Sequence, residues 1–213
     1  FEITYRNESN ENDIDENLIN CINQVFSDLS HLIIPNNCGN NPPVVNILIS
    51  FPDNMEDGNP GLASSFYDPW VQRCNSAIDL GTENSGIIDS EVWRAINTGI
   101  NDATELDAYI KLNLFSNDYQ FNTVFTSSAI TTSAQIDLYT VMLHELIHTL
   151  GFASLIDVTG ESIYHESGFD MFSRFDKYLY SNTYSENLIN QVAPYIIESS
   201  SNISSAILEN CTQ

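Results

Sequence analysis

The chain contains few basic residues. Six lysines and arginines stand against 29 aspartates and glutamates in 213 residues, which gives a formal net charge of -23 at pH 7. Such a charge repels the phosphate backbone of a nucleic acid and an anionic membrane surface, so we expect neither as a partner. A solvated acidic surface that keeps a secreted protein in solution accounts for the charge, which therefore says little about a substrate.

Long hydrophobic runs are also missing. No segment approaches the roughly 18 to 20 continuous apolar residues of a membrane helix, and residues 1–18 lack the basic-then-apolar pattern of a signal peptide. We therefore expect no membrane insertion. The chain is 42% hydrophobic, which suffices for one substantial core, and we expect a single domain and a monomer.

Cysteine is scarce, and no two of the four cysteines form a Cys-x-x-Cys pair. A cysteine-based zinc site and a thioredoxin-like motif therefore have little support. An even number of scattered cysteines is typical of disulfides, and three pairings are open for two bonds. We favour Cys21 with Cys38 and Cys74 with Cys211, because this pairing closes one local loop and ties down the C-terminal segment.

Three Asn-x-Ser/Thr sequons begin at Asn7, Asn202 and Asn210. They are compatible with an extracellular route, as are disulfides. We expect a secreted, extracellular protein.

Hydrophobic periodicity predicts the elements ahead of the chemistry. Apolar residues at spacings of three and four predict an amphipathic helix over 15–29, and a β-branched run predicts a central strand over 44–51. A serine cap at Ser90 and a terminal glycine at Gly99 bound a second predicted helix. Alternation over 106–116 predicts a half-buried strand, whose edge we expect to pair with an extended peptide.

The chemistry lies in "VMLHELIHTLGFAS", residues 141–154. We expect a helix that begins near Asp137, which can cap it, and ends at Gly151. His144 and His148 are four residues apart, so both imidazoles project from one side of this helix and can reach one ion. A catalytic zinc ion keeps one of its roughly four positions for water, and the spacing predicts such an ion on these two histidines.

Glu145 follows the first histidine and is placed near the water instead of on the metal. A glutamate there can take a proton from the attacking water and pass it to the leaving amine, which makes Glu145 the predicted general base of peptide hydrolysis. The alternative interpretation, without a function, is an ordinary amphipathic helix with a surface His/Glu pair. The surrounding apolar run disfavours it, because exposed histidines would be unusual there.

"HELIHTLGF" resembles the metzincin pattern HExxHxxG, in which the glycine turns the chain so that the residue three positions later completes the metal site. Here that residue is Ser154. A neutral serine hydroxyl is a poor zinc ligand, so the standard metzincin set of three ligands is broken.

The chain resembles more closely the leishmanolysin-like metallopeptidases and bacterial secreted proteins with HELxHxLGF, in which an insertion follows the helix. The similar segments are residues 45–51, 110–118, 135–161 and 168–180. The resemblance implies an α+β, metzincin-like zincin fold: a twisted mixed sheet, a backing helix, the active-site helix and a small C-terminal subdomain. Within a single catalytic domain over 1–213, we expect an upper subdomain over 1–151 and a lower one over 152–213.

The third zinc ligand is expected after the glycine turn, where His165, Glu166, Asp170 and Asp176 are candidates. The resemblance favours a displaced histidine, and His165 is the only histidine downstream. Imidazole is also the commonest ligand of catalytic zinc. Asp170 is the next choice, because the bacterial relatives carry an aspartate followed by an aromatic residue there.

The resemblance also implies a methionine beneath the metal, and Met171 is the only methionine downstream. A core position beside Phe169 and Phe172 explains Met171 equally well. A tyrosine that donates to the oxyanion is a further expectation, for which the candidates are Tyr164, Tyr178 and Tyr180.

Together these features favour a zinc-dependent endopeptidase that acts on a protein or peptide substrate. An alternative remains, because Ser154 replaces a ligand: a catalytically inactive zincin-fold module that binds a partner through its acidic surface. Residues 53–61 contain carboxylates without EF-hand spacing, so structural calcium is a further option under either hypothesis.

Overall fold

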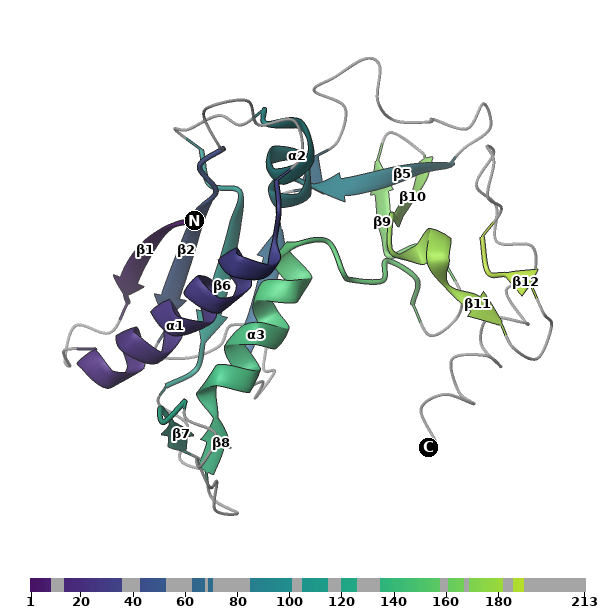
Figure 1. Cartoon of the computed structure of the whole chain (residues 1–213). Coiled ribbons are helices and arrows are strands. Elements are labelled where there is room, and N and C mark those ends of the chain that lie inside the picture. The colour runs from purple at the N-terminus through teal and green to yellow at the C-terminus, as the bar shows by residue number, and fades with distance from the viewer. Residues whose placement is uncertain are drawn as a thin grey trace. The chain divides into compact units, whose positions relative to one another are not determined.

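The computed structural model describes residues 1–8, 14–35, 43–52, 63–67, 69–70, 85–100, 105–114, 120–125, 135–157, 161–166, 169–181 and 186–189. Helices and strands are both present (Figure 1). The chain divides into two compact units. The first comprises Phe1–Asp68 and Ser90–Leu150, and the second comprises Pro69–Asp89 and Gly151–Gln213. The second unit therefore includes a segment from the first half of the chain, besides the C-terminal part.

The first unit contains a four-stranded mixed sheet in the order β1-β2-β6-β3. Strands β1, β2 and β6 are parallel, and β3 runs antiparallel to β6. The strands are β1 (Glu2–Asn7), β2 (Asn46–Phe51), β3 (Ala63–Tyr67) and β6 (Ala108–Leu112). All residues of β2 after Asn46 are buried, as expected for a strand covered on both faces, and the predicted central strand is confirmed.

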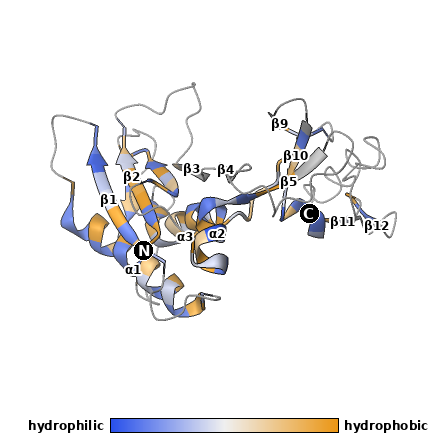
Figure 2. Ribbon diagram, turned by 90° about the horizontal axis from the view of Figure 1, so that it is seen from above, coloured by the Kyte–Doolittle hydropathy of each residue, from blue (hydrophilic) through white to orange (hydrophobic). Residues whose placement is uncertain are grey.

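Two helices of the first unit pack against each other over this sheet (Figure 1). Helix α1 (Glu16–Leu32) connects β1 to β2, and helix α3 (Leu138–Thr149) follows β8. The side chain of Asp15 caps α1 by accepting the N–H of Asn17. Figure 2 shows hydrophobic and hydrophilic residues intermixed along α1. The buried residues of α1, α2, α3, β2 and β6 form one hydrophobic cluster, which confirms the predicted amphipathic helix.

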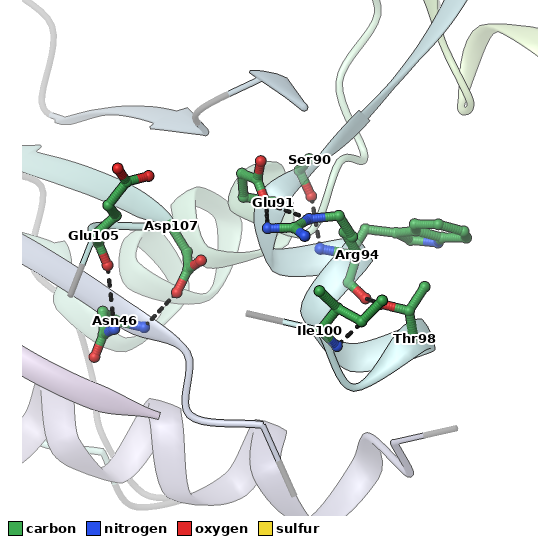
Figure 3. A network of polar contacts seen from close by, with 9 residues as sticks. Asn46, Ser90, Glu91, Arg94, Thr98, Ile100, Glu105 and Asp107 are labelled. Carbon is green, nitrogen blue, oxygen red and sulfur yellow. Dashed lines mark hydrogen bonds and ion pairs between the residues drawn. The ribbon is translucent and has the colours of Figure 1, made fainter. Parts of the chain in front are cut away.

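Helix α2 (Glu91–Thr98) begins and ends at the predicted caps. The hydroxyl of Ser90 accepts the N–H of Trp93 at 2.9 Å, and Gly99 has a φ of 71°. Figure 3 shows α2 and, beside it, the hydrogen bonds that join the start of β2 to the residues just before β6. The backbone N–H of Asn46 donates to Asp107 at 2.7 Å, and its side-chain amide donates to the carbonyl of Glu105 at 3.1 Å. These contacts fix the register of β2 against β6.

The second unit contains a sheet in the order β4-β5-β10-β9, with β5 parallel and β9 antiparallel to β10. Its strands are β4 (Pro69–Trp70), β5 (Ser85–Ser90), β9 (Tyr164–Glu166) and β10 (Phe169–Ser173). The 3-10 helix η1 (Asp176–Tyr178) follows β10. Two short pairs complete the described elements: β11 (Tyr180–Ser181) with β12 (Glu186–Asn187), and β7 (Gln120–Asn122) with β8 (Gln135–Asp137).

The expectation that residues 106–116 offer a strand edge to a peptide is wrong. That segment forms β6, which is hydrogen-bonded to β2 on one side and β3 on the other. Within the part of the sheet that the structure describes, the strand at this edge is β3.

Cys21 has a buried, free thiol on α1. This free thiol contradicts the predicted pairing of Cys21 with Cys38. The other three cysteines lie outside the described residues, so the pairing of Cys74 with Cys211 stays a prediction. The sequons at Asn202 and Asn210 and the calcium candidate over 53–61 also lie outside. Among the helices described, none is long and apolar enough to cross a membrane.

Candidate metal centre

Helix α3 is fixed at both its start and its end. Asp137 caps it by accepting the N–H of Thr140 at 3.0 Å. Gly151, just beyond the end, has a φ of 95°, which is unfavourable for residues with a Cβ. The buried side chains of Leu138, Met142 and Leu146 anchor one face of the helix in the core of the first unit. The predicted helix over 137–151 is thus confirmed.

The opposite face of α3 carries both histidines of the motif. His144 is exposed, which contradicts the expectation that exposed histidines would be unusual here, and His148 is half-buried. Their Nε2 atoms lie 2.9 Å apart, and the planes of the rings are nearly perpendicular, at 86°. Two imidazole nitrogens at this separation either share a proton or face the same cation. The prediction that both imidazoles point to one position is confirmed.

This geometry suits a zinc ion. With zinc to nitrogen bonds of about 2.0 to 2.1 Å and a tetrahedral angle, two ligating nitrogens lie about 3.3 Å apart. The observed distance of 2.9 Å between the two Nε2 atoms is only a few tenths of an ångström shorter than this separation. Two neutral imidazoles are also a donor set that zinc favours.

Glu145 lies between the histidines in sequence but has a different environment, with only 7% of the residue exposed. Among the residues that the structure describes, none forms a hydrogen bond or an ion pair with its carboxylate. The carboxylate oxygens of Glu145 are not among the buried atoms without a partner, so they keep contact with solvent although the residue as a whole is buried.

Helix α3 is held against α1 by a polar contact that the sequence analysis missed. The hydroxyl of Tyr139 donates to Oδ2 of Asp28 at 2.8 Å. This hydrogen bond, together with burial, raises the pKa of Tyr139. Nearby, burial and then the negative charge of Asp137 raise the pKa of the Cys21 thiol to about 11.

The segment after α3 folds back on itself. The hydroxyl of Ser154, which stands where a metzincin has its third ligand, accepts the N–H of Ile156 at 3.1 Å in a local turn. The carbonyl of Leu155 then accepts the N–H of Ile163 at 2.8 Å, and Ile156 pairs with Ser162 in an isolated bridge. These contacts hold Leu155 and Ile156 beside Ser162 and Ile163, just ahead of β9.

The two leading candidates for the third ligand occupy facing positions in one strand pair. His165 on β9 is the register partner of Asp170 on β10, and Tyr164 is the partner of Met171. Residues directly opposite in antiparallel strands lie on one face of a sheet. Asp170 is exposed, and the side chains of His165 and Glu166 lie outside the description. These candidates belong to the second unit, and their role as ligands stays a prediction.

Asp176, another candidate for the third ligand, is fully buried. Its Oδ2 accepts the N–H of Leu155 at 3.0 Å and that of Ser173 at 2.8 Å, while the hydroxyl of Ser173 accepts the N–H of Asp176 at 3.1 Å. Its Oδ1 is buried without a hydrogen-bond partner in the described part of the chain. Ser173 and Asp176 thus form a reciprocal pair of side-chain to backbone hydrogen bonds across the turn between β10 and η1.

Met171 is buried on β10, and its carbonyl accepts the hydroxyl of Ser162 at 2.6 Å. Tyr164 is half-buried, whereas Tyr178 and Tyr180 are exposed. Their expected roles beneath the metal and at the oxyanion stay predictions.

No group of three or more histidine, cysteine, aspartate or glutamate residues that could hold a metal occurs among the described residues. The described arrangement is therefore a histidine pair with a neighbouring glutamate. Compared with known proteins, the chain matches no family model, no curated protein and no solved structure. The site is interpreted from its own residues.

Proposed function

We propose that the chain is a zinc-dependent endopeptidase in which His144 and His148 bind the metal and Glu145 is the general base. One observation carries the proposal: the Nε2 atoms of the two histidines converge to 2.9 Å on the outward face of α3. The spacing alone permits this convergence, and the packing of the helix turns that face away from the core.

Zinc bound to this pair supplies Lewis-acid chemistry, since it acidifies water and stabilises negative charge on a carbonyl oxygen. Glu145 takes a proton from the water whose oxygen attacks the scissile carbonyl carbon. When the carbon–nitrogen bond breaks, Glu145 returns that proton to the leaving amine. The absence of a described hydrogen-bond partner leaves the carboxylate able to accept a proton from water.

The third ligand is proposed to be His165, with Asp170 as the next choice. The two candidates lie opposite each other on β9 and β10. Imidazole and carboxylate are both accepted in catalytic zinc sites, so chemistry permits either residue.

We propose a zincin fold of the metzincin type. The proposal takes the mixed sheet as the zincin sheet, α1 between β1 and β2 as the backing helix, and α3 as the active-site helix. Helix α3 contacts β3, the antiparallel strand at the edge of the described sheet. We propose that an extended peptide substrate pairs with β3, since backbone pairing tolerates many sequences.

Secretion, a monomeric state and the absence of nucleic acid as a partner complete the proposal. They rest on the sequons, the cysteine count and the net charge of -23.

The substitution Glu145→Gln tests the chemistry, because the amide preserves the shape of the side chain and removes its basicity. We expect unchanged zinc content and a loss of at least about 100-fold in cleavage of fluorescence-quenched peptides. Glu16→Gln, at an exposed position on α1, is the matched control and should cleave at the wild-type rate.

Two results would contradict the proposal. If Glu145→Gln cleaves peptides as the wild type does, Glu145 is not the base. If the zinc-loaded wild type cleaves no peptide, the inactive module with an acidic binding surface is the better hypothesis.

A further inference from the structure

Two basic side chains lie in one row across the sheet of the first unit. The parallel strands β1, β2 and β6 pair so that Arg6 lies beside Ser50 and Ser50 lies beside Lys111 (Figure 1). Register partners in neighbouring strands project from the same face of a sheet, and the strands are about 4.8 Å apart. The Cα atoms of Arg6 and Lys111 are therefore separated by about 10 Å, with Ser50 between them.

This row lies on the face of the sheet that is turned away from the helices. The hydrophobic residues that flank the row along the strands belong to or contact the cluster that the sheet shares with α1, α2 and α3; they are Tyr5, Ile49, Phe51, Ile110 and Leu112. Because successive residues of a strand point to opposite faces, the row points away from that cluster. Arg6 is exposed and Lys111 is half-buried.

Neither positive charge in the row is neutralised by a carboxylate in the described part of the chain. Arg6 and Lys111 form no ion pair and no side-chain hydrogen bond there. Nζ of Lys111 lies 5.9 Å from the centre of the Tyr109 ring, a contact that leaves the charge in place. By contrast, Arg94 and Arg174, the other arginines that the structure describes, each form an ion pair with a carboxylate. Two neighbouring cations without such a partner are unexpected in a chain with 29 acidic and six basic residues.

The hydroxyl between the two cations also has no partner. Ser50 is only 3% exposed, yet its hydroxyl forms no hydrogen bond within the described residues. It is not among the fully buried atoms that lack a partner, so it keeps contact with solvent. Polar groups in such positions are as a rule hydrogen-bonded, and here the acceptor can come from outside the protein.

We propose that Arg6, Ser50 and Lys111 bind a small tetrahedral dianion of the sulfate or phosphate class. The guanidinium fork of Arg6 and the ammonium group of Lys111 donate charge-assisted hydrogen bonds to its oxygens, and the hydroxyl of Ser50 donates another. Two cations favour a dianion over a monoanion such as acetate. The net charge of -23 does not exclude this ligand, because carboxylates more than about 8 Å away are largely screened at physiological salt. The site is independent of the proposed function.

The test titrates sulfate into the isotope-labelled full chain at constant ionic strength, with chloride as the reference anion, and follows the backbone amide shifts by NMR. We expect saturable shifts at Arg6, Ser50 and Lys111 with a Kd on the order of millimolar, and weaker binding of acetate. Methyl phosphate is the second probe, at about pH 8, where it carries both charges. Binding of both probes extends the site to monoesters, whereas binding of sulfate alone restricts it to the free ion.

Substitutions assign the binding to the row. Arg6→Gln and Lys111→Gln should each weaken sulfate binding by at least about tenfold, because each removes a charged donor. Ser50→Ala should weaken it by about three- to tenfold. Lys177→Gln is the matched control, since it changes the net charge equally from the second unit, and it should bind sulfate as the wild type does. Glu8→Gln removes the carboxylate closest to Arg6 along the chain and should tighten binding by about twofold.

Three results would overturn the site. The first is the absence of saturation up to about 50 mM sulfate. The second is wild-type affinity in Arg6→Gln, or an equal loss in Lys177→Gln, which would indicate a general effect of charge. The third is a set of shifts confined to His144 and His148, which would place the sulfate at the histidine pair. If Ser50→Ala does not fold, the variants at Arg6 and Lys111 decide. Zinc content is measured separately, so failure of this site and failure of the proposed function are distinguishable.

Discussion

The hydroxyl of Tyr139 on α3 lies 2.8 Å from Oδ2 of Asp28 on α1 and donates a hydrogen bond to it. Oδ1 of the same carboxylate accepts the side-chain amide of Gln24 at 2.7 Å. Asp28 on α1 thus connects this helix to α3, which carries the histidine pair. The contact joins residues 111 positions apart, so it contributes to tertiary structure and not only to the stability of one helix.

Tyr139→Phe removes this hydrogen bond and little else. We expect the free energy of unfolding to fall by about 1 to 2 kcal/mol, because one partner of the bond is charged. Urea denaturation measures the change. Tyr178→Phe is the control, since Tyr178 is 74% exposed, and it should have no effect on stability. Equal stabilities of Tyr139→Phe and the wild type would show that the contact contributes nothing.

Alkaline pH is expected to destabilise the protein through Cys21. Burial and the charge of Asp137 raise its pKa from 9.0 to about 11, so the folded state favours the neutral thiol. The stabilisation is complete below pH 9 and is lost as the pH rises toward 11, by on the order of 2 to 3 kcal/mol in total. Burial also raises the pKa of Tyr5 to about 12, so ionisation of Tyr5 lowers the stability of the folded state further above pH 10.

Urea titrations between pH 9 and pH 11 test this assignment. Cys21→Ala should show a shallower decline of stability in this interval than the wild type, whatever its stability at pH 7. Identical slopes would contradict the raised pKa. Mass spectrometry after thiol alkylation of the unfolded protein should also find Cys21 labelled, whereas a disulfide with Cys38 would leave it unlabelled.

Local signals explain why much of the first unit could be predicted. The helices that begin after Asp15, Ser90 and Asp137 each have a side-chain cap within three residues, and α2 ends at Gly99. These signals act within one turn of the chain, so they are readable from sequence. The convergence of His144 and His148 was predictable for the same reason, because a helix places residues four apart on one face.

Long-range pairing explains what could not be predicted. Nothing in residues 106–116 indicates that β3 would cover one of their edges, since the pairing of two strands far apart in the chain is not written in either strand alone. The incorporation of residues 69–89 into the second unit depends on the pairing of β5 with β10. The identity of a third zinc ligand after Ser154 depends on tertiary packing in the same way, so only candidate residues could be named from the sequence.

Gly151 is expected to tolerate no side chain. Its φ of 95° costs a residue with a Cβ about 1 to 2 kcal/mol. Gly151→Ala should therefore lower the melting temperature. Gly99→Ala, at a φ of 71° on another helix, should destabilise by a similar amount without changing zinc binding. A Gly151→Ala variant as stable as the wild type would contradict the turn.

Met171 is expected to act as a core residue on β10, where it is 2% exposed. Met171→Leu conserves volume and should cost less than about 1.5 kcal/mol, whereas Met171→Ala should cost about 2 to 5 kcal/mol. Thermal denaturation measures both. Zinc content that falls in Met171→Leu with stability intact would favour instead the special role beneath the metal that the metzincin resemblance implies.

The measurement that most directly tests the central claim is the zinc content of the purified protein by mass spectrometry. Wild type is compared with His148→Ala and with His31→Asn, which replaces a histidine exposed at the end of α1. The zinc content of His165→Ala and of Asp170→Ala, measured alongside, identifies the third ligand as the residue whose replacement removes zinc. We expect about one equivalent of zinc in wild type and in His31→Asn, and a loss of zinc and of peptide cleavage in His148→Ala. A wild type without zinc, or a His148→Ala variant that retains it, would contradict the metal site and the enzyme built on it.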